Sequence, residues 1–535
     1  MNSKRQALAV SAAAFALALA LAGCSKPPSK PKGIGKQLVP VAARNLTLAP
    51  GNTLVFVGEI APSQEKDVPE GVYQGILTTI PVAGGVPRQL GGGVSTLEDG
   101  YGISPDGKFV AYLQGFRFRE QAGNLNVAPL PTGDARTVAP DAKYYKFSPD
   151  SRWLGYVAGG EMHLLDLAAQ PGPGADRLVA TSAATFEFSR DSKHLLIRRP
   201  VAAGGDLLLA KVEGGAEPSK LGELVGDYAF SADSSKVAFM ARKGGPSKPY
   251  GLFLGPVGGP YESVGQGVSA FTFSSDSQWV AFTDGMGEKL GTLDLQLVPA
   301  SGGPVKQVGE NVVEYRWSPN SKAIALRENN EDKGKRWTAI KVAKVPGVVV
   351  HTSSWVPHKD MDKIPMIWSG DGEHLAFVHL VPKPEPMVHL YQVAETGGDA
   401  KVVADWVFGF QYSPDSRELW YRANCTRAGR ECELVASNAS DLTVPARKLA
   451  LGIATFKPNA KGDRLLLTYA RSDTKSNGPE APADLGWIDL NSKGTSKGVD
   501  QYVMPGASWA DDTGSQAIYI VGERKREGVY VAEIK

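Results

Sequence analysis

The sequence has few cysteines, almost no excess charge and only one long apolar run. Of its 535 residues three are Cys, and one of these, Cys24, ends the apolar run near the N-terminus. Lys and Arg number 58 against 56 Asp and Glu, and no basic block stands out after residue 36, so a nucleic-acid partner has no electrostatic basis. The 42% of hydrophobic residues exclude a disordered chain, and 61 Gly with 37 Pro indicate many turns.

The N-terminus has the features of an export signal. Residues 1–6 (MNSKRQ) are basic, residues 7–22 form an apolar run without acidic residues, and Leu-Ala-Gly-Cys at 21–24 ends it. This ending resembles the lipobox of bacterial lipoproteins, which implies removal of residues 1–23 and acylation of Cys24 for stable membrane anchoring. An uncleaved membrane helix is the alternative, although the run is shorter than the roughly 20 residues that span a bilayer.

The residues after Cys24 extend this expectation. Ser25 rather than Asp at this position resembles outer-membrane sorting in enteric bacteria, so we expect an outer-membrane lipoprotein that faces the periplasm, with the cell surface as the alternative. The stretch 25–36 (SKPPSKPKGIGK) indicates a tether, and residues 24–45 are assigned to the lipidated N-terminus and a flexible tether. Without Lys4 and Arg5 the chain has 58 − 2 = 56 basic against 56 acidic side chains, a net charge near zero.

Two further cysteines lie close together in the second half of the chain. Cys425 and Cys432 flank a polar segment with Gly429 and follow a strand-like stretch, so they would face each other across a β-hairpin loop. In the oxidising compartment of an exported protein this predicts a Cys425–Cys432 disulfide. A redox or metal pair is the alternative, but the spacing is neither C-x-x-C nor that of a zinc site.

A short motif recurs along most of the chain. ISPDGKFVAYL at 103–113, FSPDSRWLGYV at 147–157 and YSPDSRELWYR at 412–422 are three of its copies. The period, mostly 41 to 44 residues, is that of a four-stranded propeller blade. The serine position falls at Ser104, Ser148, Ser189, Ser231, Ser274, Ser318, Ser369 and Ser413, with degenerate copies expected at Lys457 and Ala510 and an eroded one at Ala49.

Each copy has the pattern of two strands joined by a tight turn. Aromatic residues one and three positions before the serine alternate as in a strand, and Ser-Pro-Asp-Gly or Ser-Pro-Asp-Ser forms the turn. The apolar residues that follow enclose a small residue, often Ala, as close packing between blades favours. The repeated Asp, for example Asp106 or Asp150, is assigned to the turn, because a catalytic pair needs two carboxylates and not seven.

These repeats resemble the WD40-like propeller repeats of the TolB family, over nearly all of residues 46–535. The resemblance implies an all-β fold, a β-propeller of about 10–11 four-stranded blades of roughly 44 residues. TolB itself carries an α/β domain before its propeller, and here only about 20 residues of tether separate Cys24 from the first expected strand, so we do not expect TolB proper. The same repeats are also found in the propellers of prolyl oligopeptidase-type and tricorn-type proteases. These peptidases append an α/β-hydrolase domain, but no G-x-S-x-G follows a strand here.

The number of blades bears on the domain organisation. Ten or eleven blades exceed the four to eight that are typical of one ring. We therefore expect two propellers in tandem, residues 46–305 and 306–535. The alternative is that residues 306–535 continue one large ring.

The histidines raise the question of a metal site. Five of the seven fall within 39 residues, and some enzymes with this repeat, such as oligogalacturonate lyases, bind a divalent metal through propeller histidines. Two of them lie five apart on one strand and so point to opposite faces, and no H-x-H or H-E-x-x-H spacing occurs. We therefore expect surface or inter-blade histidines, without a metal or another cofactor. The weak metal candidates are His351, His358, His374, His379 and His389.

The sequence favours a binding or scaffolding module of the bacterial cell envelope over an enzyme. Propellers present a wide ring of loops, and function lies on those loops. The resemblance implies an envelope protein or envelope polymer as partner, as TolB meets peptidoglycan-associated lipoprotein, and the loop QGFRFREQ at 114–121 is a candidate contact. The alternative is an envelope hydrolase or lyase that acts on glycans or peptides at the propeller axis, although nothing in the sequence names a reaction.

Overall fold

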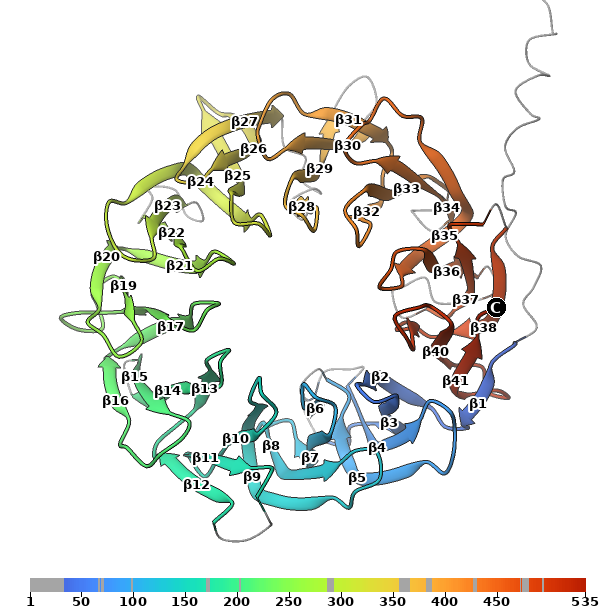
Figure 1. Cartoon of the computed structure of the whole chain (residues 1–535), viewed down its shortest axis with the longest axis horizontal. Helices are drawn as coiled ribbons and strands as arrows, with labels where there is room; N and C mark the ends of the chain where they lie inside the picture. The colour runs from blue at the N-terminus through green and yellow to red at the C-terminus, as the bar shows by residue number, and fades with distance from the viewer. Residues whose placement is uncertain are drawn as a thin grey trace, which may run out of the picture.

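A computed structural model describes residues 33–65, 68, 72–97, 100–169, 174–201, 204–285, 293–355, 366–381, 387–426, 431–471, 473, 481–492 and 495–535. The strands in these residues pair antiparallel, and they follow one another once around a single ring (Figure 1). No α-helix occurs among the described residues, so none of them provides the long apolar helix that a membrane crossing requires. The all-β propeller expected from the sequence is confirmed.

The described strands form eleven four-stranded blades, and three long strands each end one blade and begin the next. Blades 1 to 4 are β2 (Ala43–Ala49), β3 (Thr53–Pro62), β4 (Tyr73–Pro81) and β5 (Arg88–Ser95); β6 (Tyr101–Ile103), β7 (Phe109–Arg117), β8 (Ala122–Pro129) and the first half of β9 (Arg136–Phe147); the second half of β9 with β10 (Trp153–Ala158), β11 (Glu161–Asp166) and β12 (Asp176–Ala180); and β13 (Thr185–Phe188), β14 (His194–Val201), β15 (Gly204–Lys211) and β16 (Ser219–Gly222).

Blades 5 to 8 continue the same order. They are β17 (Val225–Phe230), β18 (Lys236–Ala241), β19 (Gly251–Pro256) and β20 (Glu262–Gln266); β21 (Val268–Phe273), β22 (Trp279–Asp284), β23 (Leu293–Pro299) and the first half of β24 (Lys306–Trp317); the second half of β24 with β25 (Ala323–Asp332), β26 (Lys335–Lys344) and β27 (Val348–Trp355); and β28 (Met366–Trp368), β29 (His374–Val381), β30 (Met387–Ala394) and β31 (Lys401–Asp405).

Blades 9 to 11 share one sheet. They are β32 (Gly409–Tyr412), β33 (Glu418–Thr426), β34 (Glu431–Asn438) and the first half of β35 (Arg447–Pro458); the second half of β35 with β36 (Arg464–Ala470), β37 (Ala483–Asp489) and β38 (Lys497–Val503); and β39 (Ser508–Trp509), β40 (Gln516–Val521) and β41 (Gly528–Glu533), completed by β1 (Lys36–Val39).

The first strand of the described residues closes the ring. β1 pairs antiparallel with β41, with Lys36 opposite Val531 and Val39 opposite Val529. Side chains of blade 11, such as Ile518, then pack with Phe56 of blade 1 in one apolar cluster. The last blade is therefore built from both ends of the described chain and is sealed against the first.

The hydrophobic core is divided among the spaces between neighbouring blades. Each apolar cluster joins two consecutive blades, as Val57 and Leu77 of blade 1 do with Tyr112 of blade 2. The small residues that the repeat places in the second strand are fully buried there, which allows blades to approach closely. These residues are Ala111, Ala238, Ala281, Ala325 and Ala376.

The repeated turn is held by its own side chains. Ser104 Oγ donates to Asp106 Oδ1 at 2.7 Å and accepts from the backbone N–H of Phe109 at 3.0 Å, while Asp106 also accepts from the N–H of Lys108 at 3.1 Å. The same three contacts recur in other copies, for example at Ser148 and Asp150. The Asp of the motif is thus a turn former, as expected.

The second serine of Ser-Pro-Asp-Ser joins neighbouring blades, which the sequence did not indicate. It stands in the left-handed region at φ of 60 to 63°, and its Oγ accepts the backbone N–H of the motif Asp of the preceding blade at 2.9 to 3.1 Å. We call these contacts the inter-blade serine bonds. The pairs are Asp106 with Ser151, Asp150 with Ser192, Asp191 with Ser234, Asp233 with Ser277, Asp276 with Ser321, and Asp371 with Ser416.

Three expectations from the sequence change. One ring replaces two tandem propellers, since β24 runs directly from blade 6 into blade 7 beside the expected boundary at residue 305. β1 and the start of β2 lie within residues 24–45, which were assigned to a tether. In blade 10 the serine position belongs to Asn459 and not to Lys457, because Asn459 Oδ1 accepts from the N–H of Arg464 at 3.0 Å.

Candidate functional site

The connections of the blades lie on two different faces of the ring. Successive strands of a blade are antiparallel, so the serine-motif turns share one face with the turns between third and fourth strands. We call this the turn face. The opposite side, the loop face, carries the loops between second and third strands and the links from blade to blade.

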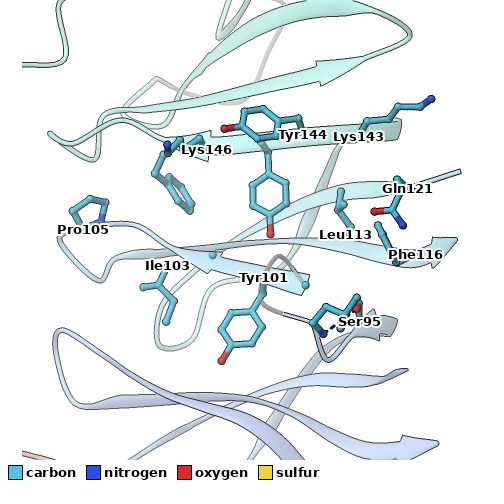
Figure 2. Close-up of a pocket in the computed structure, with 15 residues that line it drawn as sticks. Ser95, Tyr101, Ile103, Pro105, Leu113, Phe116, Gln121, Lys143, Tyr144 and Lys146 are labelled. Carbon is cyan, nitrogen blue, oxygen red and sulfur yellow. Dashed lines mark hydrogen bonds between the residues drawn. The ribbon is translucent and has the colours of Figure 1, made fainter. Parts of the chain in front are cut away.

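A cleft of about 340 Å³ opens between the innermost strands of blades 2 and 3 (Figure 2). The apolar part of its wall is formed by Ile103 of β6, Leu113 of β7 and Phe147 of β9. Lys143 and Gln121 lie at one end of the cleft, and Pro105 and Lys146 at the other. This volume lies at the lower end of the range of ligand sites.

Gly102 lines the cleft and leaves room there because it has no side chain. In blades 1 and 6 the residue two before the serine position is a threonine that bonds a tyrosine of the next blade. Thr47 contacts the Tyr101 hydroxyl at 2.7 Å, and Thr272 contacts the Tyr315 hydroxyl at 3.4 Å. Gly102 occupies the same position opposite Tyr145, whose hydroxyl donates to Ala111 O at 3.3 Å instead.

The two ends of the cleft differ in charge balance. Lys146 Nζ contacts the Glu187 carboxylate of blade 4 at 2.7 Å and is neutralised by it. Lys143 is exposed and has no ion pair with a described residue, since nearby Asp141 pairs with Arg117. The end of the cleft at Lys143 is therefore the positively charged one.

The loop 114–121, the candidate partner contact of the sequence analysis, contributes Phe116 and Gln121 to the lining of this cleft. Phe116 lines the cleft and meets Phe118 edge to face, with ring centroids 5.1 Å apart. Glu65 of blade 1 accepts from the backbone N–H of Phe118 at 3.0 Å, which fixes the loop. Burial raises the pKa of Tyr101 at the rear wall to about 12, against the opposing effect of its bond to Thr47. The aromatic wall is thus held in place by blades 1 and 2 together.

An exposed aromatic pair marks a second place on the loop face. Trp406 and Phe408 of the link between β31 and β32 are 40% and 45% exposed. Trp406 has φ of 55°, a left-handed conformation that is costly for a bulky side chain. Among the described residues, six other blades also have a positive φ at this position, seven before the serine, and five of the six place Gly, Asn, Asp or Ser there. The occupants are Asp141, Ser182, Leu224, Gly267, Asn311, Trp406 and Gly452.

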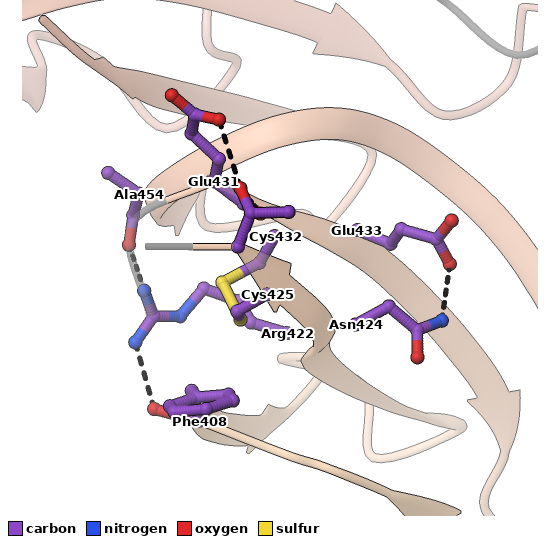
Figure 3. Close-up of a disulfide and its surroundings, with 9 residues drawn as sticks. Phe408, Arg422, Asn424, Cys425, Glu431, Cys432, Glu433 and Ala454 are labelled. Carbon is purple, nitrogen blue, oxygen red and sulfur yellow. Dashed lines mark hydrogen bonds between the residues drawn. A yellow bond between two sulfur atoms is a disulfide. The ribbon is translucent and has the colours of Figure 1, made fainter. Parts of the chain in front are cut away.

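The predicted cysteine pair lies beside this aromatic pair. Cys425 Sγ and Cys432 Sγ form a disulfide between β33 and β34, with the two Cα atoms 3.9 Å apart (Figure 3). Arg422 on β33 donates to Phe408 O at 2.9 Å and also to Ala454 O of the next link. Burial lowers the pKa of Arg422. The disulfide and Arg422 thus hold the backbone under Phe408.

Four of the five candidate histidines lie in the described residues, and these four do not come together as a metal site. His351 is buried, and its ring nitrogens contact Gly398 O and Ser353 Oγ at 2.7 Å each. His379 lies directly opposite His389 across β29 and β30. Burial, helped by the charge of His389, lowers the pKa of His379 to about 4. Within the part of the chain that the structure describes, no three His, Cys, Asp or Glu side chains are grouped for a metal ion.

The remaining candidates are accounted for separately. His389 Nδ1 bonds Asp405, and His374 begins β29 away from the other histidines. His358 and the lipidation residue Cys24 lie outside the described residues. The sequence analysis missed Gly102, Lys143 and Trp406. Their roles depend on contacts between blades, which a single repeat does not display.

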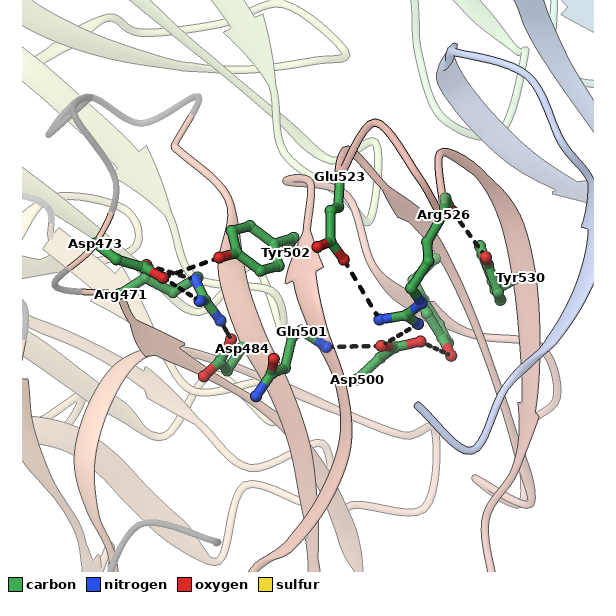
Figure 4. Close-up of polar contacts among 10 residues, drawn as sticks. Arg471, Asp473, Asp484, Asp500, Gln501, Tyr502, Glu523, Arg526 and Tyr530 are labelled. Carbon is green, nitrogen blue, oxygen red and sulfur yellow. Dashed lines mark hydrogen bonds and ion pairs between the residues drawn. The ribbon is translucent and has the colours of Figure 1, made fainter. Parts of the chain in front are cut away.

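A buried carboxylate stands where the N-terminal segment joins the ring (Figure 4). Asp500 of β38 is fully buried and accepts from Tyr519 Oη at 2.9 Å and Arg526 Nη2 at 2.5 Å. Gly33 runs directly over this group, since a Cβ there would come within 2.8 Å of Asp500 Oδ1. The N–H of Ile34 donates to Val499 O at 3.0 Å. The chain thus enters along the outer edge of blades 10 and 11.

Comparisons with known proteins found structural likeness only. No family model matches the chain, and no curated protein matches it in sequence. It is similar to a structure titled as a eukaryotic initiation factor (14% identity over 79% of this chain and 93% of that one, TM-score 0.44). It is also similar to TolB from Acinetobacter baumannii (14%, 55% and 78%, TM-score 0.26) and to an oligogalacturonate lyase in complex with manganese (16%, 57% and 88%, TM-score 0.29). Likeness at this level supports no inference about function, and the propeller rests on its own strand order.

Proposed function

We propose that this protein is a lipid-anchored β-propeller of the bacterial cell envelope that acts as a binding or scaffolding module. Its partner is an envelope protein or envelope polymer that meets the loop face. The anchor is Cys24, in an outer-membrane lipoprotein that faces the periplasm. The export signal and lipobox at residues 1–24 support this location.

The difference between the two faces is the observation that carries the proposal. The turn face repeats one side-chain arrangement from blade to blade, and its serines and aspartates are used within the turns and between blades. The loop face differs from blade to blade and holds both Lys143, at the mouth of the cleft, and Trp406. Variable loops on a rigid scaffold, with an exposed Trp, are typical of binding surfaces.

The anchor and the ring are compatible in geometry. Gly33 lies nine positions after Cys24, and an extended chain of nine steps reaches about 30 Å at most. Gly33 lies at the outer edge of blades 10 and 11, beside Asp500. An anchor at Cys24 would hold this edge near the membrane, while the cleft lies between blades 2 and 3.

Cross-linked affinity capture from the native envelope tests the proposal. Wild type is compared with Cys24→Ala, which removes the anchor, and with Trp406→Ala on the loop face. Val86→Ala removes an exposed apolar side chain on the turn face and is the matched control. One or a few envelope proteins or polymers recovered with wild type and Val86→Ala, and depleted with the other two variants, support the proposal.

Two outcomes would contradict it. Equal capture by all four proteins would mean that neither the anchor nor the loop face takes part. A stoichiometric metal or processed glycan in place of a partner would favour the hydrolase or lyase alternative, which rests on no described group of side chains.

A further inference from the structure

We infer that the cleft between β6 and β9 receives an apolar side chain of a partner protein, aromatic or branched, that stands next to a carboxylate. This inference rests on the proposed binding function and names the chemistry of the partner at the cleft. Three properties of the cleft support it: its size, the nature of its walls and the position of its unpaired cation.

Size and wall chemistry favour a side chain over a polymer. A cleft of about 340 Å³ holds one or two side chains, not several sugar rings. Two of the polar side chains that line it are already engaged: Ser95 Oγ accepts from the N–H of Leu97 at 3.0 Å, and Gln121 Nε2 donates to Phe118 O at 2.6 Å. A sugar would leave many hydroxyl groups without partners there, whereas an apolar side chain loses nothing.

The positive charge of Lys143 at the mouth of the cleft favours a partner with a carboxylate beside the inserted side chain. Lys143 lines the end of the cleft that also holds Gln121 and Phe116, and it has no ion pair with a described residue. Lys146 at the other end is occupied by Glu187 at 2.7 Å. A carboxylate beside the inserted side chain would therefore find its partner in Lys143. The pair would be exposed, so it selects the ligand more than it strengthens binding.

Gly102 offers a way to close the cleft without disturbing the ring. A Cβ at Gly102 would stand 3.6 Å from Tyr145 Cε2, an ordinary contact, and the residue is not in the left-handed region. Gly102→Thr would also reproduce the threonine that faces a tyrosine at Thr47 and Thr272. The matched control is Ala229→Thr, at the same repeat position in blade 5, where the next blade has Phe271 and no hydroxyl.

The test uses the whole protein and three small probes in saturation-transfer difference NMR. N-acetyl-phenylalanine carries an aromatic side chain beside a carboxylate, its amide lacks the charge, and chitotriose represents a glycan. We expect the acid to bind wild type about threefold more tightly than the amide, the size of one exposed ion pair. Lys143→Gln should bring this ratio to about one, with Lys108→Gln on the turn face as the control.

The closed cleft gives the second readout. Gly102→Thr should weaken the binding of both phenylalanine probes by more than about tenfold, because it fills their site, while Ala229→Thr should change nothing. Equal binding of acid and amide to wild type, or tighter binding of chitotriose, would overturn the inference. If envelope capture still depended on Gly102 in that case, the binding function would stand and only the partner chemistry would be wrong.

Discussion

Ser277 Oγ accepts the backbone N–H of Asp233 at 3.0 Å and thereby joins blade 6 to blade 5. Ser277 holds φ of 62° to make this contact, a conformation that costs an L-residue about 1 kcal/mol or more. The position therefore favours glycine for its backbone and serine for its hydroxyl. Glycine does occur there in three copies of the turn, at Gly107, Gly372 and Gly462.

Substitution at Ser277 separates these two effects. We expect Ser277→Ala to lower the free energy of unfolding by about 1–2 kcal/mol, because the hydrogen bond is lost and the strained φ remains. Ser277→Gly loses the same bond and relieves the strain, so its loss should be smaller. Urea unfolding followed by tryptophan fluorescence measures both. Equal losses in the two variants would contradict the assigned role of the backbone conformation.

Acid should weaken the repeated turns. Burial would raise the pKa of Asp233, but bonds from Ser231 and from the N–H and hydroxyl of Ser235 lower it to about 2, from its usual 3.8. The folded pKa is depressed, so this stabilisation is present above about pH 4 and is lost as the pH falls towards 2. We expect the urea midpoint of wild type to fall over that range and that of Asp233→Asn to fall less. Identical pH profiles would contradict this contribution of Asp233.

The disulfide should stabilise the hairpin beside the aromatic pair. It closes a small loop, with a sequence separation of 7, and a loop of this size corresponds to about 2 kcal/mol. We expect Cys425→Ser combined with Cys432→Ser to lose about this much stability, and dithiothreitol to weaken wild type but not the double variant. If both cysteines are alkylated in native protein that was purified without a reductant, the pair is reduced and the disulfide assignment is wrong.

Trp406 should favour binding at the expense of stability. Trp406→Gly removes a bulky residue from a left-handed position, so we expect the free energy of unfolding to rise by about 1 kcal/mol. Capture of the envelope partner should fall in the same variant, since an exposed Trp is a common hot spot. Thermal unfolding and capture are measured in parallel, with Gly452→Ala as a control that introduces strain at the same repeat position. A stable variant with undiminished capture would remove Trp406 from the binding surface.

The buried Asp500 should determine how firmly the N-terminal segment is held. Asp500 is fully buried but the side chain of Arg526 is 34% exposed, so removing the carboxylate should cost less than the roughly 3–5 kcal/mol of a fully buried pair. Asp500→Ala should therefore destabilise blade 11 moderately and speed hydrogen exchange of residues 34–39. Asp484→Ala disturbs the neighbouring ion pair with Arg471 and should leave exchange of residues 34–39 unchanged. Similar exchange in the two variants would contradict the role of Asp500.

The repeat made the blades and their turns predictable, because each is encoded locally. Aromatic alternation and Ser-Pro-Asp gave the strands and turns, and the pair Cys425 and Cys432 was visible as two cysteines at the ends of a hairpin loop. The serine position of blade 10 was predicted two residues too early, at Lys457 instead of Asn459. An amide oxygen can accept the same hydrogen bond as a serine hydroxyl, although the two residues do not resemble each other in sequence. Such equivalences are visible only in the hydrogen bonds.

Whether the predicted 10–11 blades form one ring or two could not be predicted in this way. The cleft could not be predicted either. How many blades close one ring depends on the angle at which neighbours pack, and that angle does not appear in the period. β1 has only four residues and no copy of the motif, and its partner β41 lies some 490 residues away. Gly102 becomes informative only when the contact of Thr47 with Tyr101 is known.

Closure by β1 also fixes the order in which the ring can be completed. Of the described strands, the first to be synthesised, β1, pairs with the last, β41, and at 5–20 residues per second roughly half a minute or more separates them. Until then blades 1 to 10 form an open arc with apolar end faces, as the shared cluster of blades 11 and 1 shows. Such an arc could exchange β1 with a second copy of the chain. During assembly, closure of the ring within one chain therefore competes with domain swapping of β1 between two chains.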